Sequence, residues 1–297
     1  RTHTLRARPW RSFIGAVQWR SFVLASMLVA ALLAANGGRA AEPQVPVLWD
    51  TKERLPKPDL SALPRLRFLT TTDFPPFNFL DGAGKLSGFH IDLARAICAE
   101  LSIVEKCQIQ ALPWVELEGA LQKGEGEAII AGIAATPQSR STYAFSRSYL
   151  QFPARFVMAK GTALTDPVFD KLRGKRVGVI AGSAHERMLR DYFNTVQVVP
   201  FDRPEDLYND LKTGKIDAAF GDGMRLAFWL GGSDASGCCR FAGGPYLAPE
   251  YLGSGMAIAT KADNPALAAA LDYALQEISM KGTFAEFYLR YFPVSFY

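Results

Sequence analysis

The sequence has few side chains of the kinds that hold metal ions. Its 297 residues include only three histidines and four cysteines. None of them stands in a CxxC or HxxxH spacing, and a structural zinc site needs four such ligands in a tetrahedron. The pattern predicts no metal site, and nothing in it indicates a cofactor.

Long apolar runs are also scarce. The main one, SFVLASMLVAALLAA, lies within residues 1–40, where there are several arginines and no acidic residue. It spans roughly 15 residues, whereas a membrane-spanning helix needs about 20. A basic start, a short apolar core and small residues before a polar stretch are typical of a signal peptide. We expect residues 1–40 to be removed by cleavage after Ala40; the alternative is an uncleaved anchoring helix.

A basic surface is missing once this leader is set aside. The formal net charge of +4 includes six leader arginines, so 27 basic residues then face 29 acidic ones. No basic stripe with interleaved aromatic residues occurs in the remainder, which argues against a nucleic-acid partner.

The four cysteines form two separate pairs. An exported chain meets an oxidising compartment, where disulfide bonds are the ordinary outcome. Cys98 and Cys107 lie across a predicted helix end and the next strand, a short loop that a disulfide could close. Cys238 and Cys239 are adjacent in a Gly/Ser-rich loop, where direct pairing is geometrically difficult. A vicinal bond and two free thiols both remain open.

Strand-like and helix-like segments alternate after a Pro-rich stretch at 41–65, which we interpret as an extended arm. This alternation predicts parallel βαβ units. The blocks ELEGALQKGEGEAIIAG and DLYNDLKTGKIDAAFGD repeat one design, a helix, a glycine turn and an apolar strand, which indicates two similar lobes. Ligands of open α/β sheets bind beyond the carboxyl ends of strands. The residues after AIIAG, VGVIAG and IDAAFG should therefore converge on one cleft.

An ordered set of segments extends this pattern from Leu66 to Phe292. They are TTDFPPFNF, LSGFHIDLARAI, EAIIAGIAATPQSR, YAFSRSYL, LRGKRVGVIAGSAHE, LKTGKIDAAFGD, GSGMAIATK and KGTFAEFYLRYF. Each is degenerate alone, but the ordered set closely resembles the bacterial periplasmic solute-binding proteins of family 3, which deliver polar amino acids to ABC importers.

The resemblance implies a type II periplasmic-binding-protein fold, an α/β fold of two lobes hinged on two crossover strands. Lobe 1 would comprise residues 66–153 plus 253–297, and lobe 2 residues 154–252. The ligand would be a small amino acid or a related carboxylate, and the protein would be a periplasmic monomer that meets the membrane subunits of an ABC importer.

The same resemblance assigns binding roles. Asp222 would hold the ligand's α-ammonium and Arg140 its α-carboxylate, with Ser183 as a hydroxyl of the carboxylate pocket. Phe74 and Trp114 would flank the ligand side chain. A disulfide between Cys98 and Cys107 resembles one in the basic-amino-acid branch of the family, with a longer spacing here.

The sequence departs from the family pattern at the arginine motif. Many members have T-P-E-R, whereas TPQSR places Arg140 one residue later. Either a bulge restores its position or the carboxylate contact has changed. Gly132 and Ala134 occupy positions that are often serines, so the ligand wall at Ala134 offers fewer hydroxyls.

Simpler interpretations stand beside these roles. Arg147 and Arg155 are rivals of Arg140 for a carboxylate. Asp222 could cap the helix formed by MRLAFWL instead of binding a ligand. His90 has no paired carboxylate or serine, and we interpret it as a satisfied surface or capping residue.

We expect the protein not to be an enzyme. One alternative is a periplasmic dehydratase of the cyclohexadienyl type, which has the same fold and needs a pocket acid; Glu116, Glu186 and Glu250 are the candidates. A second alternative is an accessory or sensory binding protein that partners a periplasmic or membrane protein, which the CysCys segment and the long arm leave open.

Overall fold

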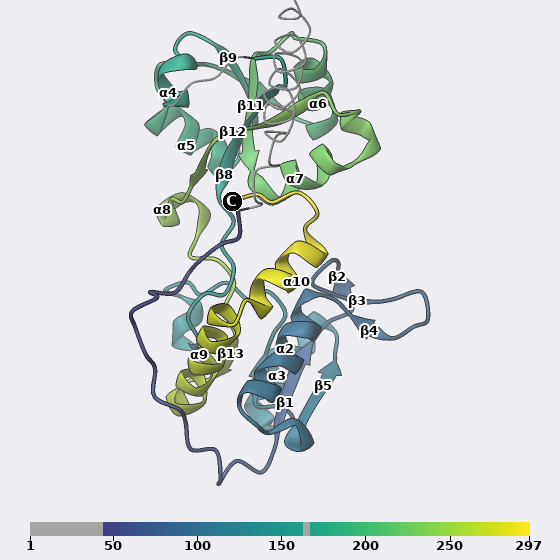
Figure 1. The fold of residues 1–297 in the computed structure, drawn as a ribbon, viewed down its shortest axis with the longest axis vertical. Helices are drawn as coiled ribbons and strands as arrows, with labels where there is room; N and C mark the ends of the chain where they lie inside the picture. The colour runs from purple at the N-terminus through teal and green to yellow at the C-terminus, as the bar shows by residue number, and fades with distance from the viewer. Residues whose placement is uncertain (1–43, 163–166) are drawn as a thin grey trace, which may run out of the picture. The chain divides into compact units, whose positions relative to one another are not determined.

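Two five-stranded mixed sheets organise the protein (Figure 1). The computed structural model describes residues 44–162 and 167–297, so the predicted signal peptide lies outside the described residues. In the first sheet the order is β5-β1-β6-β13-β7. Its strands are β1 (Leu66–Thr70), β5 (Cys107–Ala111), β6 (Ala128–Ile129), β7 (Tyr143–Phe145) and β13 (Ala259–Lys261). With its helices we call this sheet lobe 1.

The helices of lobe 1 come from both halves of the sequence. α2 packs against α9 and α10, so the last helices of the chain join the first. A small antiparallel sheet, in the order β2-β3-β4, precedes α2. The helices are α2 (Phe89–Glu100), α3 (Leu117–Lys123), α9 (Pro265–Met280) and α10 (Thr283–Tyr291), and the small strands are β2 (Asp73–Phe74), β3 (Asn78–Leu80) and β4 (Leu86–Ser87).

The second sheet, in the order β10-β9-β11-β8-β12, forms lobe 2 with the helices around it (Figure 1). Its strands are β8 (Ala154–Ala159), β9 (Arg176–Ile180), β10 (Gln197–Phe201), β11 (Ala218–Asp222) and β12 (Cys239–Tyr246). Its helices are α4 (Val168–Lys171), α5 (Ala184–Tyr192), α6 (Pro204–Lys212), α7 (Gly223–Gly231) and α8 (Pro249–Leu252).

The predicted parallel pairing holds for only part of each sheet. β1 pairs in parallel with β5 and β6, and β9 with β10 and β11. In contrast, β13 is antiparallel to β6 and β7, and β8 is antiparallel to β11 and β12. β8 follows the passage of the chain from the first sheet to the second, and β13 follows its return, so these strands enter outside the βαβ series. The residues at which the chain changes lobes, near 153 and 253, stay a prediction.

The repeated helix–glycine–strand design is confirmed in both lobes. α3 ends at Gly124 and α6 is followed by Gly214, with φ angles of 74° and 75°. Glycine is favoured after a helix because the left-handed conformation there costs it no steric penalty. β6 is shorter than the predicted strand AIIAGIAAT, since Gly132 turns the chain with a φ of 87°. This turn places the residues after β6 at the carboxyl edge of the sheet.

Both cysteine pairs are disulfide-bonded. The Cys98–Cys107 bond joins the end of α2 to the start of β5, as expected. Cys238 and Cys239 form a vicinal disulfide, which decides between the two possibilities left by the sequence. The predicted loop is wrong at this point, because Cys239 begins β12, an edge strand hydrogen-bonded to β8.

Removal of the Cys98–Cys107 bond by the double substitution Cys98→Ser and Cys107→Ser should lower the free energy of unfolding by about 2–3 kcal/mol. The bond closes a loop with a sequence separation of 9, and an entropy cost of this size applies to the unfolded chain when such a loop is opened. Urea unfolding measures the loss. The matched control is Cys238→Ser with Cys239→Ser, whose bond spans adjacent residues and restricts almost no loop. Equal losses in the two double variants would contradict the entropic argument.

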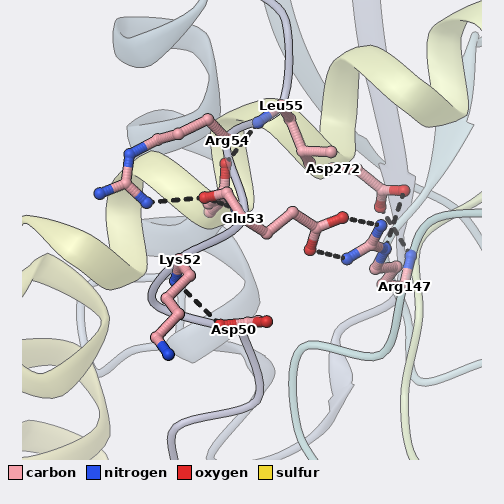
Figure 2. A network of polar contacts seen from close by, with 8 residues as sticks. Asp50, Lys52, Glu53, Arg54, Leu55, Arg147 and Asp272 are labelled. Carbon is pink, nitrogen blue, oxygen red and sulfur yellow. Dashed lines mark hydrogen bonds and ion pairs between the residues drawn. The ribbon is translucent and has the colours of Figure 1, made fainter.

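The Pro-rich segment before β1 is held against lobe 1 by a polar network (Figure 2). The guanidinium of Arg147 donates two parallel hydrogen bonds to the Glu53 carboxylate, at 2.5 and 2.7 Å. The backbone N–H of Arg147 donates to Asp272 of α9 at 2.7 Å. The amide oxygen of Gln276 accepts a hydrogen bond from the N–H of Leu55 at 3.0 Å. The arm is therefore part of the folded lobe over the described residues from 44 onward.

Within the described residues, no helix is both long enough and apolar enough to cross a lipid bilayer.

Candidate functional site

The carboxyl ends of β9 and β11 open into one cavity of lobe 2, with a volume of about 290 Å³. Ser183 and Asp222, both predicted as ligand residues, line it. Its other polar lining residues are His185, Tyr208 and Arg225. The prediction that the residues after VGVIAG and IDAAFG converge is thus confirmed for lobe 2.

Ser183 is the N-cap of α5 and both of its hydrogen-bonding functions are in use. Its Oγ accepts from the N–H of Glu186 at 3.1 Å and donates to the carbonyl of Ile180 at 2.7 Å. Glu186 accepts in return from the N–H of Gly182, the residue before the N-cap, in a variant of the capping box. Because the hydroxyl proton is committed to Ile180, Ser183 in this arrangement can only accept a further hydrogen bond.

Asp222 ends β11 and caps α7, so the capping role that the sequence left open is confirmed, and its role in ligand binding stays a prediction. Its Oδ1 accepts from the N–H of Arg225 at 2.8 Å. No hydrogen bond or ion pair to Oδ2 is present within the parts of the chain that the structure describes. The carboxylate therefore keeps an open oxygen in a cavity that a cationic group can enter.

His185, Tyr208 and Arg225 were not predicted from the sequence. His185 lies in the first turn of α5 and Arg225 in the first turn of α7. The Nε2 atom of His185 is buried and has no hydrogen-bond partner. Burial lowers the pKa of His185, an effect that the Asp222 carboxylate opposes and the Arg225 guanidinium assists. A useful signal would have been their spacing, since residues within one turn of a helix N-cap lie at the same sheet edge.

Tyr208 forms an aromatic wall of the same cavity. Its ring stacks on Trp229 of α7, with centroids 4.4 Å apart and an interplanar angle of 13°. Burial raises the pKa of the Tyr208 phenol. This stacked pair fixes the ring in place, so the wall is rigid before any ligand arrives.

The lobe 1 half of the candidate site lies where β1 and β5 end. These strands are paired from Leu66 opposite Cys107 to Thr70 opposite Ala111, so the segments that follow them are neighbours. They border a cavity of about 360 Å³ lined by Thr71, Thr72, Asp73, Ala111, Leu112 and Pro113. Phe74 and Trp114 come directly after these lining residues on the two segments.

Phe74 and Trp114 differ in exposure. The Phe74 ring is half-buried, stacks on Phe77 at 4.8 Å, and approaches Gly132 so closely that a Cβ there would lie 2.9 Å from it. Gly132 thus makes room for the ring. Trp114 is 53% exposed, so most of its surface is available to a ligand or to solvent.

Ala134 and Arg140 stand on the segment after β6. Ala134 forms an isolated bridge with Met256, and its carbonyl accepts from the Ser139 hydroxyl at 2.8 Å. This contact supports a short 3₁₀ turn, Ser139–Ser141, which carries the exposed Arg140. The guanidinium lies over the Phe145 ring, 5.6 Å from its centroid. Arg140 lines neither of the two cavities in this structure.

The two rival arginines are already engaged. Arg147 holds Glu53 of the N-terminal arm. Arg155 of β8 is 8% exposed, donates from Nε to the Gly243 carbonyl at 2.9 Å, and lies 4.4 Å from the Phe241 ring centroid. Burial lowers the pKa of Arg155. Of the three arginines that the sequence offered, Arg140 alone has no protein hydrogen-bond partner for its guanidinium within the described segments.

His90 lies in the core, so its interpretation as a surface or capping residue is wrong, although its hydrogen bonds are satisfied. The ring is 0% exposed, with Nδ1 2.7 Å from Asn78 Oδ1 and Nε2 2.8 Å from the Tyr149 hydroxyl. Asn78 donates onward to the Thr71 hydroxyl at 2.7 Å. Burial lowers the pKa of His90 to about 3. A neutral ring with both nitrogens occupied has no free position for catalysis.

Clusters of three or more His, Cys, Asp or Glu side chains that could hold a metal ion are absent from the portions of the chain that the structure describes.

Comparison with known proteins gives a consistent result. Residues 66–294 match the family described as bacterial extracellular solute-binding proteins, family 3. The ABC transporter arginine-binding protein 1 of Escherichia coli (strain K12) is 30% identical over 233 residues, which cover 78% of this chain and 93% of that protein. The lysine/arginine/ornithine-binding periplasmic protein of the same organism is 30% identical over 240 residues, which cover 80% and 91%.

Solved structures support the fold. An ancestral cyclohexadienyl dehydratase matches with a TM-score of 0.65 at 18% identity and covers 79% of this chain and 95% of its own. At this identity the match bears on architecture alone. The predicted two-lobed α/β fold is confirmed by this match together with the two sheets.

Proposed function

Because this chain belongs to family 3 of the bacterial extracellular solute-binding proteins, we propose that the solute it binds is an amino acid or a close analogue. The observation that carries the proposal is the open carboxylate oxygen of Asp222 at the carboxyl edge of the lobe 2 sheet. Asp222 is half-buried, and an unpaired carboxylate becomes costly when a closing cleft removes it from water, so a ligand ammonium would complete its hydrogen bonds.

The lobe 1 residues supply the other contacts in this proposal. Arg140 binds the ligand's α-carboxylate with two parallel hydrogen bonds, a geometry that suits a guanidinium. Phe74 and Trp114 flank the ligand side chain, and Ala134 forms part of the wall. Ser183 accepts a hydrogen bond from the ammonium, because its own proton is given to Ile180.

Closure about the two crossover segments near 153 and 253 would bring these halves together. A ligand with contacts on both lobes favours the closed state by its differential affinity for that state. The relatives named for arginine, lysine and ornithine include a periplasmic protein and an ABC transporter component. We accordingly place this protein in the periplasm after leader cleavage, as a monomer that presents its closed form to the importer's membrane subunits.

We also propose that the protein is not an enzyme. Two of the acids considered for dehydratase chemistry have protein partners: Glu186 binds Gly182 and Arg190, and Glu250 accepts from Tyr192. Glu116 is exposed in the turn after Trp114. None of the three lines either cavity, where the acidic lining residues are Asp73 and Asp222 instead, so none of these three candidates is placed to act as the acid of an elimination reaction there.

A thermal-shift screen against amino acids, opines, polyamines and small carboxylates tests the proposal. A ligand present at 100 times its Kd should add about 2.7 kcal/mol of stability. The protein is expressed with its leader and recovered from the periplasm. A folded protein that no amino acid stabilises would overturn the proposal, and turnover of prephenate or arogenate would favour the dehydratase. If this chain binds no ligand but a second protein co-purifies with it from the periplasm, the accessory role would be favoured.

A further inference from the structure

The lobe 2 cavity is lined by more cationic or hydrogen-bond-donating side chains than acidic ones. Asp222 is the one acidic side chain among its lining residues, and Oδ1 of that carboxylate is already used to cap α7. The Arg225 guanidinium carries the opposite charge, as does the His185 imidazole when it is protonated. The cavity can therefore satisfy one ligand cation and still retain unused donors.

Arg225 has no charged partner of its own. Its backbone N–H donates to Asp222, yet no ion pair within 4.0 Å and no side-chain hydrogen bond of Arg225 occurs in the described part of the chain. The helix turn thus separates the guanidinium from the nearest carboxylate. A planar guanidinium with five free donors at a cavity wall matches a carboxylate or another planar oxyanion.

His185 adds a second unsatisfied group. Its Nε2 atom is buried without a partner, and a buried polar atom in that state is destabilising. The His185 ring and the Arg225 side chain line the same cavity. A ligand oxygen bound by Arg225 would also satisfy Nε2 once the imidazole turns that atom toward the cavity, because Nε2 has no accessible surface in this structure.

We propose, building on the amino-acid function above, that the ligand carries a carboxylate on its side chain, and that Arg225 and His185 bind this group. Asp222 holds the α-ammonium beside it, and Arg140 takes the α-carboxylate from lobe 1. A cationic side chain in this cavity would face Arg225 without a second carboxylate to offset it. Specificity is therefore the reverse of that named for the arginine-binding relative.

The competing arrangement places a cationic ligand side chain in lobe 1, where Asp73 lines the other cavity. Asp73 and Arg225 are both exposed, so exposure does not decide between the two arrangements. This arrangement predicts tight binding of arginine or lysine that Asp73→Asn weakens. The two arrangements therefore differ in both the preferred ligand and the sensitive residue.

Isothermal titration of the full chain, as recovered from the periplasm, separates them. The ligands are aspartate, glutamate, 2-aminoadipate, glutamine, arginine, lysine and succinate. We expect an acidic amino acid to bind best. Arg225→Gln should weaken that ligand about 100-fold while changing glutamine less than about threefold, and His185→Gln should weaken it about tenfold. The control is Arg173→Gln, an exposed arginine before the opposite end of β9.

The outcomes are distinguishable. Preferential binding of arginine, lysine or glutamine, or equal losses for glutamate and glutamine in Arg225→Gln, overturns the acidic specificity and leaves the amino-acid function standing. Binding of succinate with no amino acid keeps the anion site but refutes the amino-acid function. No binding by the folded protein refutes both. Far-UV circular dichroism confirms that each variant is folded.

Discussion

Acidification from pH 7 to pH 4.5 should cost the protein about 2.5 kcal/mol of stability through His90 alone. The ring is buried, and burial lowers its pKa from an ordinary value of 6.5 to about 3. Between these values the unfolded chain binds a proton that the folded protein does not. The contribution is therefore fully present above pH 6.5 and is lost as the pH falls toward 3, at about 1.36 kcal/mol per pH unit.

Urea unfolding of the wild type and of His90→Gln at pH 7 and pH 4.5 measures this term. The difference between the stability losses of the two proteins isolates His90. Burial also lowers the pKa of His185, but His185 is present in both proteins. His90→Gln should show a smaller loss on acidification. Tyr149→Phe serves as the control, since it removes the hydroxyl hydrogen bond but leaves the ring buried. An identical pH dependence in wild type and His90→Gln would refute the argument.

The His90 network also joins the ligand cleft to the rest of lobe 1. Thr71 lines the lobe 1 cavity and accepts from Asn78, which lies against His90, and Tyr149 stands on the other side of the ring. Tyr149 immediately precedes Leu150, which bridges to Met256 on the returning segment. A chain of satisfied buried hydrogen bonds of this kind fixes side-chain orientation. It orients Thr71 at the lobe 1 cavity and connects that cavity to the segment that bridges to Met256.

This network shows what a single sequence cannot supply. The repeated helix–glycine–strand blocks and the apolar strands were predictable, because periodicity and turn residues are local signals. His90 looked like a surface residue because its partners lie 12 and 59 positions away. Nothing local identifies Asn78 and Tyr149 as its neighbours, so its burial depends on tertiary packing.

The candidate site was likewise predictable only in part from the sequence. Ser183 and Asp222 were assigned by the family resemblance, and they lie where ligands of α/β sheets bind, Ser183 just after β9 and Asp222 at the end of β11. Arg225 and His185 enter the same cavity from the first turns of the next helices, so their role depends on side-chain direction. Arg147 could not be separated from Arg140 by sequence, because its partner Glu53 belongs to the N-terminal arm.

Asp222→Asn should abolish most ligand binding while leaving the fold intact. Asparagine caps a helix about as well as aspartate, so the contact with the Arg225 N–H survives and the stability of the unliganded protein should change by less than about 0.5 kcal/mol. The negative charge that faces the ligand ammonium is lost. Removal of one partner from a buried charge pair costs about 2–5 kcal/mol, so the Kd should rise at least about 30-fold. Titration calorimetry with the ligand found by the screen measures this change.

Asp222→Ala provides the comparison that separates capping from binding. It removes the cap as well as the charge, so it should add a stability loss of about 1 kcal/mol to a binding defect similar to that of Asp222→Asn. If Asp222 were only a cap, Asp222→Asn would bind normally and Asp222→Ala would lose stability alone. Because Oδ1 is committed to α7 and Oδ2 faces the cavity without a partner in the described chain, we expect the two variants to share the binding defect and to differ in stability.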